Sequence, residues 1–353
     1  MKISHSSKRI IHRESELLRH FREVIDNEAE LNWLIPSGQA HQDRLSFVDL
    51  RLDSQIERFK PVYRLKPSLP DLEASLRNWT ELSAPLLVVP NLTDRILDFC
   101  RQKRLAAIDL NGRAYIRAEG LLVDRGALLT RNFRFELEPR NIFVGKSAGI
   151  VRALLTDRDR VWIQSALVER ANVSSGLVSR IVNHLNSQNF IEKQSVRQFR
   201  LRDPLGLIDA WAKADDFDRR TTTWHYTAFG GSPLEIAHKI QTWAKEQSIA
   251  LAFTQWIAGW LRYPYAEPAL TSAYISRLPE IAVLERFGLR PVSDAGKIWF
   301  HTPTDHGVFL ETQTVQDLPL VTDAQIYLDL QRTGLRGPDQ AEALRNWQGF
   351  CRP

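Results

Sequence analysis

The alternation of apolar and polar positions predicts an α/β arrangement for the first part of the chain. One amphipathic helix is expected within residues 14–35, because its apolar residues recur at helical spacing: Leu17, Phe21, Val24 and Ile25. Short β-prone runs follow at residues 45–50, 61–65 and 86–89, with a helix between Leu72 and Trp79. Thr93 or Asn91 is placed to cap a further helix that runs to about Lys103. Asn111-Gly112, between residues 107–110 and 114–116, is a strong signal for a tight turn between two strands.

From Ser147 the pattern changes to closely spaced helices and a hairpin. One apolar face is formed by Ile150, Val151, Leu154 and Leu155, and a second by Ile163, Ala166, Leu167 and Ala171. After a break at residues 172–174, a helix is expected from Ser175 to Gln188, with apolar residues at i, i+3, i+4 and i+7: Val178, Ile181, Val182 and Leu185. Two alternating runs, at residues 190–193 and 198–201, then predict a hairpin.

Beyond Pro204 the chain returns to a mixed pattern. Ser232-Pro233 favours a helix start, residues 249–261 are mostly apolar, and the last long helix is expected from Asp323 to about Leu330. The sequence therefore predicts a mixed α/β, multidomain protein. The expected domains are an α/β domain over residues 1–139, a winged helix-turn-helix over residues 140–204, and a C-terminal α/β domain over residues 205–353.

Composition narrows the class of protein. The 353 residues fit two to three domains of roughly 150 residues each. No run approaches the roughly 18 apolar residues that span a membrane, and the basic N-terminus lacks the apolar stretch of a secretory signal. We therefore expect a cytoplasmic protein without a membrane partner. Cys100 and Cys351 are too few for a disulfide framework, and free thiols are expected.

The positive charge is concentrated in one segment. Of the net +5, residues 140–203 contribute +6, because eleven Lys and Arg face five Asp and Glu there, and the rest of the chain sums to −1. The eleven cations are Arg140, Lys146, Arg152, Arg158, Arg160, Arg170, Arg180, Lys193, Arg197, Arg200 and Arg202. Such a local excess is typical of a surface that binds an anionic partner.

The same segment has the layout of a helix-turn-helix, in which the third helix faces the DNA major groove. Ser174 is expected to cap that helix. The apolar stripe leaves Ser175, Gly176, Ser179, Arg180 and Asn183 on the opposite side. Arg suits guanine, Asn suits adenine, and Ser with the first amides of a helix suits phosphate. The hairpin carries Lys193, Arg197, Arg200 and Arg202, which we expect to contact the DNA backbone as a wing. Winged helices also dock proteins, so a docking module is the alternative for this segment.

A second pattern concerns the N-terminal part. Asp49, followed by Arg64-Leu65-Lys66 at the end of the next strand, resembles the two acids and lysine of restriction-endonuclease-like folds, where the acids bind Mg²⁺. Here Arg64 occupies the position of the second acid. A cation there opposes a metal, so we expect a degenerate nuclease-like domain without activity. The simpler alternative is that Asp49 and Lys66 are ordinary surface residues on strands.

Two further motifs predict no chemistry. Gly145-Lys146-Ser147-Ala148-Gly149 matches the nucleophile elbow of hydrolases, but Ser147 is better explained as a helix N-cap. His301, Asp305 and His306 lack the spacing of a zinc site. We expect no metal, no cofactor and no catalytic residue.

Three segments together resemble the AbiEi-type antitoxin regulators of bacterial type IV toxin-antitoxin systems. They are residues 107–116 (AIDLNGRAYI), the predicted winged helix from Ser147 to Arg202, and residues 325–330 (QIYLDL) with Arg336-Gly337 and residues 341–345 (AEALR). The first segment reads Asn-Gly where the family tends to have Gly-Asn. The resemblance implies an antitoxin that represses its own promoter and counters a nucleotidyltransferase-like toxin.

The sequence as a whole predicts a transcriptional regulator that binds double-stranded DNA and is not an enzyme. A homodimer is plausible, since sequence-specific DNA-binding proteins often occupy paired half-sites. The competing hypothesis is a metal-dependent nuclease or DNA-modifying enzyme that the winged helix targets to DNA.

Overall fold

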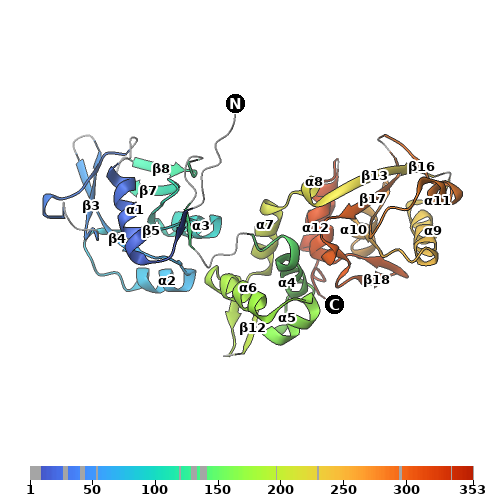
Figure 1. Cartoon of the computed structure of the whole chain (residues 1–353), viewed down its shortest axis with the longest axis horizontal. Coiled ribbons are helices and arrows are strands. Elements are labelled where there is room, and N and C mark those ends of the chain that lie inside the picture. Colours follow the sequence, from blue (N-terminus) through green and yellow to red (C-terminus); the bar gives the residue numbers. More distant parts are fainter. Residues whose placement is uncertain are drawn as a thin grey trace. The chain divides into compact units, whose positions relative to one another are not determined.

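A computed structural model shows a mixed α/β protein built of helices and several sheets (Figure 1). It describes residues 9–26, 31–39, 44–52, 55–118, 121–128, 133–135, 141–195, 197–228, 230–293, 296–334 and 336–352. Arg140 and the basic residues at positions 1–8 lie outside these ranges. The chain forms two compact units, one of Met1–Pro139 with His184–Asn189 and one of Arg140–Asn183 with Phe190–Pro353. The expected boundary at residue 204 lies within the second unit and stays a prediction.

The first unit is built on a seven-stranded mixed sheet. Its spatial order follows the chain, β2-β3-β4-β5-β6-β7-β8. β4, β5 and β6 are parallel to one another, and the remaining neighbours are antiparallel. The strands are β2 (Trp33–Leu34), β3 (Val48–Leu52), β4 (Gln55–Tyr63), β5 (Ala84–Val89), β6 (Ala106–Asp109), β7 (Ala114–Ala118) and β8 (Leu121–Arg125). Separately, β1 (Arg9–Ile11) pairs in parallel with β9 (Phe133–Phe135).

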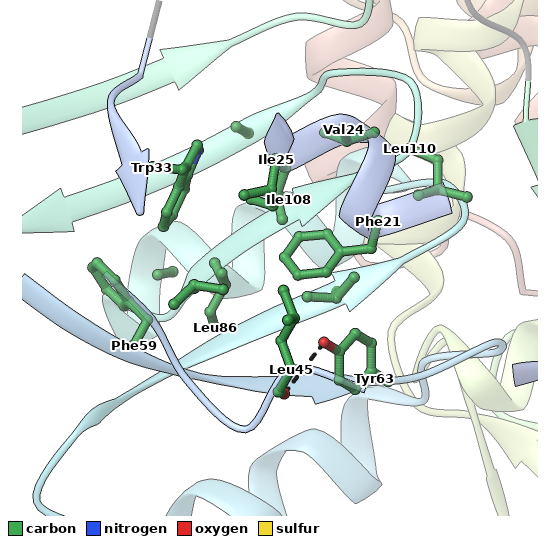
Figure 2. Packing of buried hydrophobic residues seen from close by; sticks show 14 of the residues in the cluster. Phe21, Val24, Ile25, Trp33, Leu45, Phe59, Tyr63, Leu86, Ile108 and Leu110 are labelled. Carbon is green, nitrogen blue, oxygen red and sulfur yellow. Dashed lines mark hydrogen bonds between the residues drawn. The ribbon is translucent and has the colours of Figure 1, made fainter. Parts of the chain in front are cut away.

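Helices cover both faces of this sheet, because its central strands are apolar on both sides. On one face, α1 (Glu14–Asp26) buries the predicted stripe of Leu17, Phe21, Val24 and Ile25. Figure 2 shows this core, where Phe21 packs edge-on against Tyr63 at 5.7 Å between ring centroids and the Tyr63 hydroxyl donates to the Leu45 carbonyl at 3.4 Å. On the other face, α2 (Leu69–Arg77) and α3 (Asp94–Lys103) pack on a second apolar cluster that includes Val89 and Cys100.

Two local predictions in this unit are confirmed. Thr93 caps α3, since its side-chain oxygen accepts from the Ile96 N–H at 3.3 Å. Asn111-Gly112 forms the turn between β6 and β7, with Gly112 at φ 85°, a backbone conformation that favours glycine.

The second unit begins with three helices and a three-stranded antiparallel sheet, although the end of the third helix, from His184 on, is grouped with the first unit. In chain order these are α4 (Gly145–Leu155), β10 (Val161–Ile163), α5 (Gln164–Ala171), α6 (Ser175–Ser187), β11 (Ile191–Lys193) and β12 (Gln198–Leu201). β12 lies between β10 and β11. The three predicted helices and the hairpin are present. The strand β10 was not predicted, and the assignment of Ile163 to a helical face was wrong, because Ile163 ends β10 and is 43% exposed while Trp162 beside it is buried.

The rest of the second unit surrounds another seven-stranded mixed sheet. The strand order is β16-β13-β17-β15-β14-β19-β18. Its strands are β13 (Thr221–Thr227), β14 (Leu251–Thr254), β15 (Thr271–Ile275), β16 (Arg290–Pro291), β17 (Ile298–Pro303), β18 (Gln313–Val315) and β19 (Leu318–Leu320). The helices are α7 (Pro204–Ala214), α8 (Phe217–Arg220), α9 (Pro233–Glu246), α10 (Gln255–Arg262), α11 (Ile281–Arg286), the 3-10 helix η2 (His306–Phe309), α12 (Asp323–Leu330) and α13 (Gly337–Asn346).

Neighbouring residues of β17 show how the helices cover the two faces of this sheet. Phe300 stacks on Trp243 of α9, while His301 contacts Phe217 of α8 and Tyr274.

The helix starts predicted at Ser232 and Asp323 are confirmed, and Ser232 forms a full capping box with Glu235. Cys100 and Cys351 are buried free thiols. Among the described residues, no helix has both the length and the apolar character needed to cross a bilayer.

Candidate nucleic-acid interface

The helices α5 and α6 are joined by a tight turn at residues 172–174. Asn172 ends α5 in the left-handed conformation, at φ 49°, and its N–H donates to the Glu169 carbonyl at 3.3 Å. Ser174 starts the next helix. Its side-chain oxygen accepts from the Leu177 N–H at 3.4 Å, so the predicted cap is confirmed.

The two sides of α6 differ as the periodicity predicts. Val178, Ile181, Val182 and Leu185 are each at most 1% exposed. On the other side Ser175, Arg180 and Asn183 are exposed and Ser179 is half-buried, while Ser174 is exposed just before the helix. The buried stripe fixes the rotation of the helix, and it therefore fixes which polar side chains reach solvent.

The hairpin after α6 carries the other predicted cations. Lys193 ends β11, Arg197 precedes β12, Arg200 lies within β12, and Arg202 follows it; all four are exposed. Arg200 Nε donates to Glu192 Oε1 at 2.5 Å across the hairpin, where the two residues are register partners. The carboxylate of Glu192 therefore partly neutralises the charge of Arg200 before any ligand binds.

The structure separates surface cations from cations that hold the fold. Arg152 is buried, and Arg170 forms an ion pair with Glu311. Arg160 is exposed, and its guanidinium lies over the Trp162 ring at 4.4 Å. The α6 face and the hairpin together retain five cations and one acid, Glu192, or +4. The five cations are Arg180, Lys193, Arg197, Arg200 and Arg202. Periodicity alone shows Arg152 inside the apolar run of residues 150–155, and this is the signal by which its burial could have been predicted.

Ser147 does not cap α4, and this prediction was wrong. The helix begins at Gly145, the N-cap position is Val144, and Val144 makes no side-chain capping bond. Ser147 lies in the first helical turn, because Gly145 at φ 54° allows the chain to turn into the helix two residues earlier.

The structure places Asp49 far from Arg64 and Lys66. Asp49, on β3, is paired in register with Arg58 on β4, and Arg64 and Lys66 follow the end of β4. At about 3.3 Å per residue, Arg64 lies roughly 20 Å along the strand from the position facing Asp49. The motif predicted from Asp49, Arg64 and Lys66 is therefore not assembled.

A different set of residues faces Asp49. Arg58 binds it with both arms of the guanidinium, Nε to Oδ1 at 2.8 Å and Nη2 to Oδ2 at 2.9 Å, and this bond raises the pKa of Arg58. Lys60, two residues on, lies on the same side of β4 and pairs with Glu81 at 2.5 Å. The carboxylate of Asp49 is thus held by a cation, and the neighbouring strand offers Arg and Lys but no second acid on that side.

The other polar candidates are structural. His301 is fully buried with its Nδ1 at 2.9 Å from Thr223 Oγ1, and Asp305 caps η2 by accepting from the Gly307 N–H at 3.0 Å. No group of three or more His, Cys, Asp or Glu within the described ranges is arranged to hold a metal.

Residues 107–116 form a buried polar anchor at the end of the first sheet. Asp109 accepts from the backbone N–H groups of Leu92, Asn111 and Arg113 at 2.8 to 2.9 Å, and burial raises its pKa to about 6. Asn111 binds the Phe133 backbone in both directions, at 2.6 and 3.0 Å. These bonds order the loops around the β6–β7 turn.

No family model, curated protein or solved structure matches this chain.

Proposed function

We propose that the chain is a DNA-binding transcriptional regulator and that residues 140–204 form a winged helix-turn-helix. The order α4-β10-α5-α6-β11-β12, with the hairpin β11–β12 after the third helix, is typical of this module and supports the proposal. In this arrangement α6 enters the major groove and the hairpin follows the phosphate backbone.

The observation that carries the proposal is the exposed side of α6. Arg180 and Asn183 project from the face opposite a fully buried stripe, at a spacing of three residues that keeps them on one side of the helix. Arg and Asn are the side chains that bind guanine and adenine edges bidentately. Ser174, Ser175 and the first amides of α6 suit a phosphate at the helix N-terminus.

The hairpin supplies the charge that sequence-independent affinity requires. Lys193, Arg197 and Arg202 are exposed, and Arg200 adds to them although Glu192 partly offsets it. Each phosphate that they neutralise releases counterions, so binding is expected to weaken steeply as salt rises.

The antitoxin role rests on the resemblance of residues 107–116, the segment 147–202, and residues 325–330 with Arg336-Gly337 and residues 341–345 to AbiEi-type regulators. The specific proposal is that the chain represses its own promoter and that its protein partner is a nucleotidyltransferase-like toxin. A homodimer on paired half-sites belongs to the same proposal.

For the first unit we propose a restriction-endonuclease-like scaffold without activity. The scaffold is supported only by the mixed sheet with helices on both faces. The Asp49–Arg58 pair supports the lack of activity, because a bidentate guanidinium occupies the carboxylate that would otherwise bind Mg²⁺. The chain is accordingly proposed not to be an enzyme.

The test is fluorescence anisotropy with two duplexes, one from the region upstream of the gene and one scrambled, at two salt concentrations. Each titration is run in EDTA and in Mg²⁺, and the DNA is then analysed on a gel. Selective, salt-dependent binding with intact DNA is the expected result. Equal and weak binding to both duplexes would instead favour a protein-docking module.

Cleavage of the DNA in Mg²⁺ would contradict the proposal that the chain is a regulator without nuclease activity. The variant Asp49→Ala is the control for that outcome, since loss of cleavage in this variant assigns the reaction to the first unit.

A further inference from the structure

A cavity of about 440 Å³ lies within the second unit, between the start of α4, the helices α7 and α8, the end of β17 and η2. This volume falls in the range of small-molecule sites, about 300–1,000 Å³. The residues of its wall that matter here are Phe143, Arg152, Trp211, Arg219 and Arg220. None of them belongs to the exposed face of α6, so the cavity is separate from the proposed DNA interface.

Arg152 on the cavity wall is a buried cation with most of its donors unused. The residue is 3% exposed. Its Nη2 donates to Gln325 Oε1 at 3.1 Å, whereas Nε and Nη1 have no partner among the described residues. Burial lowers the pKa of Arg152. A buried donor without an acceptor costs free energy, and a charged one costs more, so an acceptor from a ligand would offset this cost.

The carboxylates on the same wall are engaged by other donors of the chain. Asp215 binds both Nε and Nη2 of Arg220, at 2.7 and 3.1 Å. Asp216 accepts from the Arg219 N–H at 3.2 Å, and Asp305 accepts from the Gly307 N–H. No carboxylate of the described residues forms an ion pair with Arg152. Its charge is felt by Asp305 and Asp329 only through space, and Gln325 stands between it and Asp329, to which the Gln325 Nε2 donates at 2.8 Å.

An aromatic surface lies beside this cation. The rings of Phe143 and Trp211 are stacked, with centroids 5.7 Å apart and planes 21° apart. The Arg152 guanidinium carbon is 5.6 Å from the centroid of Trp211. The cavity therefore combines a flat apolar wall with a buried cation whose Nε and Nη1 have no partner among the described residues, and the combination suits a ligand with an apolar ring and a carboxylate.

We propose that this cavity binds a small organic anion of the aromatic carboxylate class. The carboxylate accepts from Arg152, and the ring packs against Phe143 and Trp211. The proposal does not depend on DNA binding, because neither the cavity nor its ligand involves α6.

The test uses benzoate as the probe and the full-length protein without DNA. Binding is followed by isothermal titration calorimetry and by tryptophan fluorescence, to which Trp211 contributes. Benzamide is the matched neutral ligand, with the same ring and nearly the same size. We expect saturable benzoate binding in the millimolar range or tighter, and benzamide weaker by about tenfold or more.

Three variants assign the signal to the cavity. Arg152→Met keeps the length of the side chain and removes the donors, and should weaken benzoate by about tenfold or more. Phe143→Ala removes a half-buried ring and should weaken it severalfold, and Arg180→Ala, on the exposed side of α6, should leave it unchanged. If Arg152→Met does not fold by circular dichroism, the benzamide comparison and Phe143→Ala decide the question.

The proposal is overturned if benzoate gives no saturable signal up to about 10 mM. It is also overturned if benzamide binds as well as benzoate, if folded Arg152→Met keeps the wild-type affinity, or if Arg180→Ala weakens benzoate as much as the cavity variants do.

Discussion

Arg170, in the last turn of α5, binds Glu311 with both arms of its guanidinium, and the two residues are 141 positions apart in the chain. The Arg170 Nε donates to Glu311 Oε1 at 2.6 Å, and Glu311 is 13% exposed. The pair ties the helix before the proposed recognition helix to the loop between η2 and β18. One cation of the basic segment thus stabilises the fold, and it is not available to a nucleic acid.

Arg170→Gln is expected to lower the free energy of unfolding by about 1 kcal/mol, because it leaves the mostly buried Glu311 carboxylate without its partner. Urea unfolding measures the change, with Arg180→Gln as an exposed control expected to stay within about 0.5 kcal/mol of wild type. The salt dependence of DNA binding should not change in Arg170→Gln. A salt slope lower by about one would show instead that Arg170 contacts phosphate.

Arg180→Ala and Asn183→Ala should each reduce the discrimination between the specific and the scrambled duplex by about 1–3 kcal/mol, the range for one bidentate base contact. Anisotropy with both duplexes measures the ratio of affinities. Lys193→Ala is the matched comparison, since an exposed hairpin cation should weaken both duplexes alike. If all three variants behave in the same way, α6 does not bind base edges.

Glu192→Gln is expected to raise the affinity for both duplexes. The substitution removes the carboxylate that neutralises Arg200, so Arg200 becomes available to a phosphate and the salt slope steepens by about 0.9. Glu267→Gln, which removes an exposed acid in the C-terminal part, controls for the change in net charge. An unchanged affinity in Glu192→Gln would place the hairpin away from the DNA backbone.

His301 should make the stability of the second unit sensitive to acid. Burial lowers its pKa from 6.5 to about 3, with smaller contributions from Arg220 and His225, so the folded state keeps the ring neutral. The unfolded chain binds a proton below pH 6.5, and the folded chain does not until about pH 3. The free energy of unfolding therefore falls as pH decreases through this window, at up to about 1.4 kcal/mol per pH unit for this one group.

The comparison with His301→Gln isolates that contribution from the carboxylates that titrate in the same range. Urea unfolding at several pH values should show the wild type losing more stability on acidification than the variant does. Parallel pH profiles for the two proteins would rule out the neutral buried histidine as the cause.

The sequence by itself determined the elements whose pattern is local. The stripe Val178, Ile181, Val182 and Leu185 predicts α6 and its exposed side, because a helix brings residues three and four apart onto one face. The caps at Ser174, Thr93 and Ser232 and the turn at Asn111-Gly112 are local for the same reason: each depends on residues within four positions.

Only the tertiary structure decided which partners each charged residue meets. Asp49 meets Arg58 because β3 and β4 pair in that register, and a one-residue shift of register would have changed every partner. The sequence alone predicts that Asp49 lies near Arg64 and Lys66, and this prediction was wrong because strand ends are the least certain part of a pattern.

Arg152 shows most clearly the difference between what a local pattern determines and what tertiary packing determines. Its charge counts toward the basic segment in the sequence, yet the fold buries it beside Trp211 and Gln325, which lie 59 and 173 positions away. Periodicity places a side chain on one face of a helix, but the environment that the face meets is assembled from distant segments. For this reason the rotation of α6 was determined locally, and the role of Arg152 was determined by packing between segments far apart in the chain.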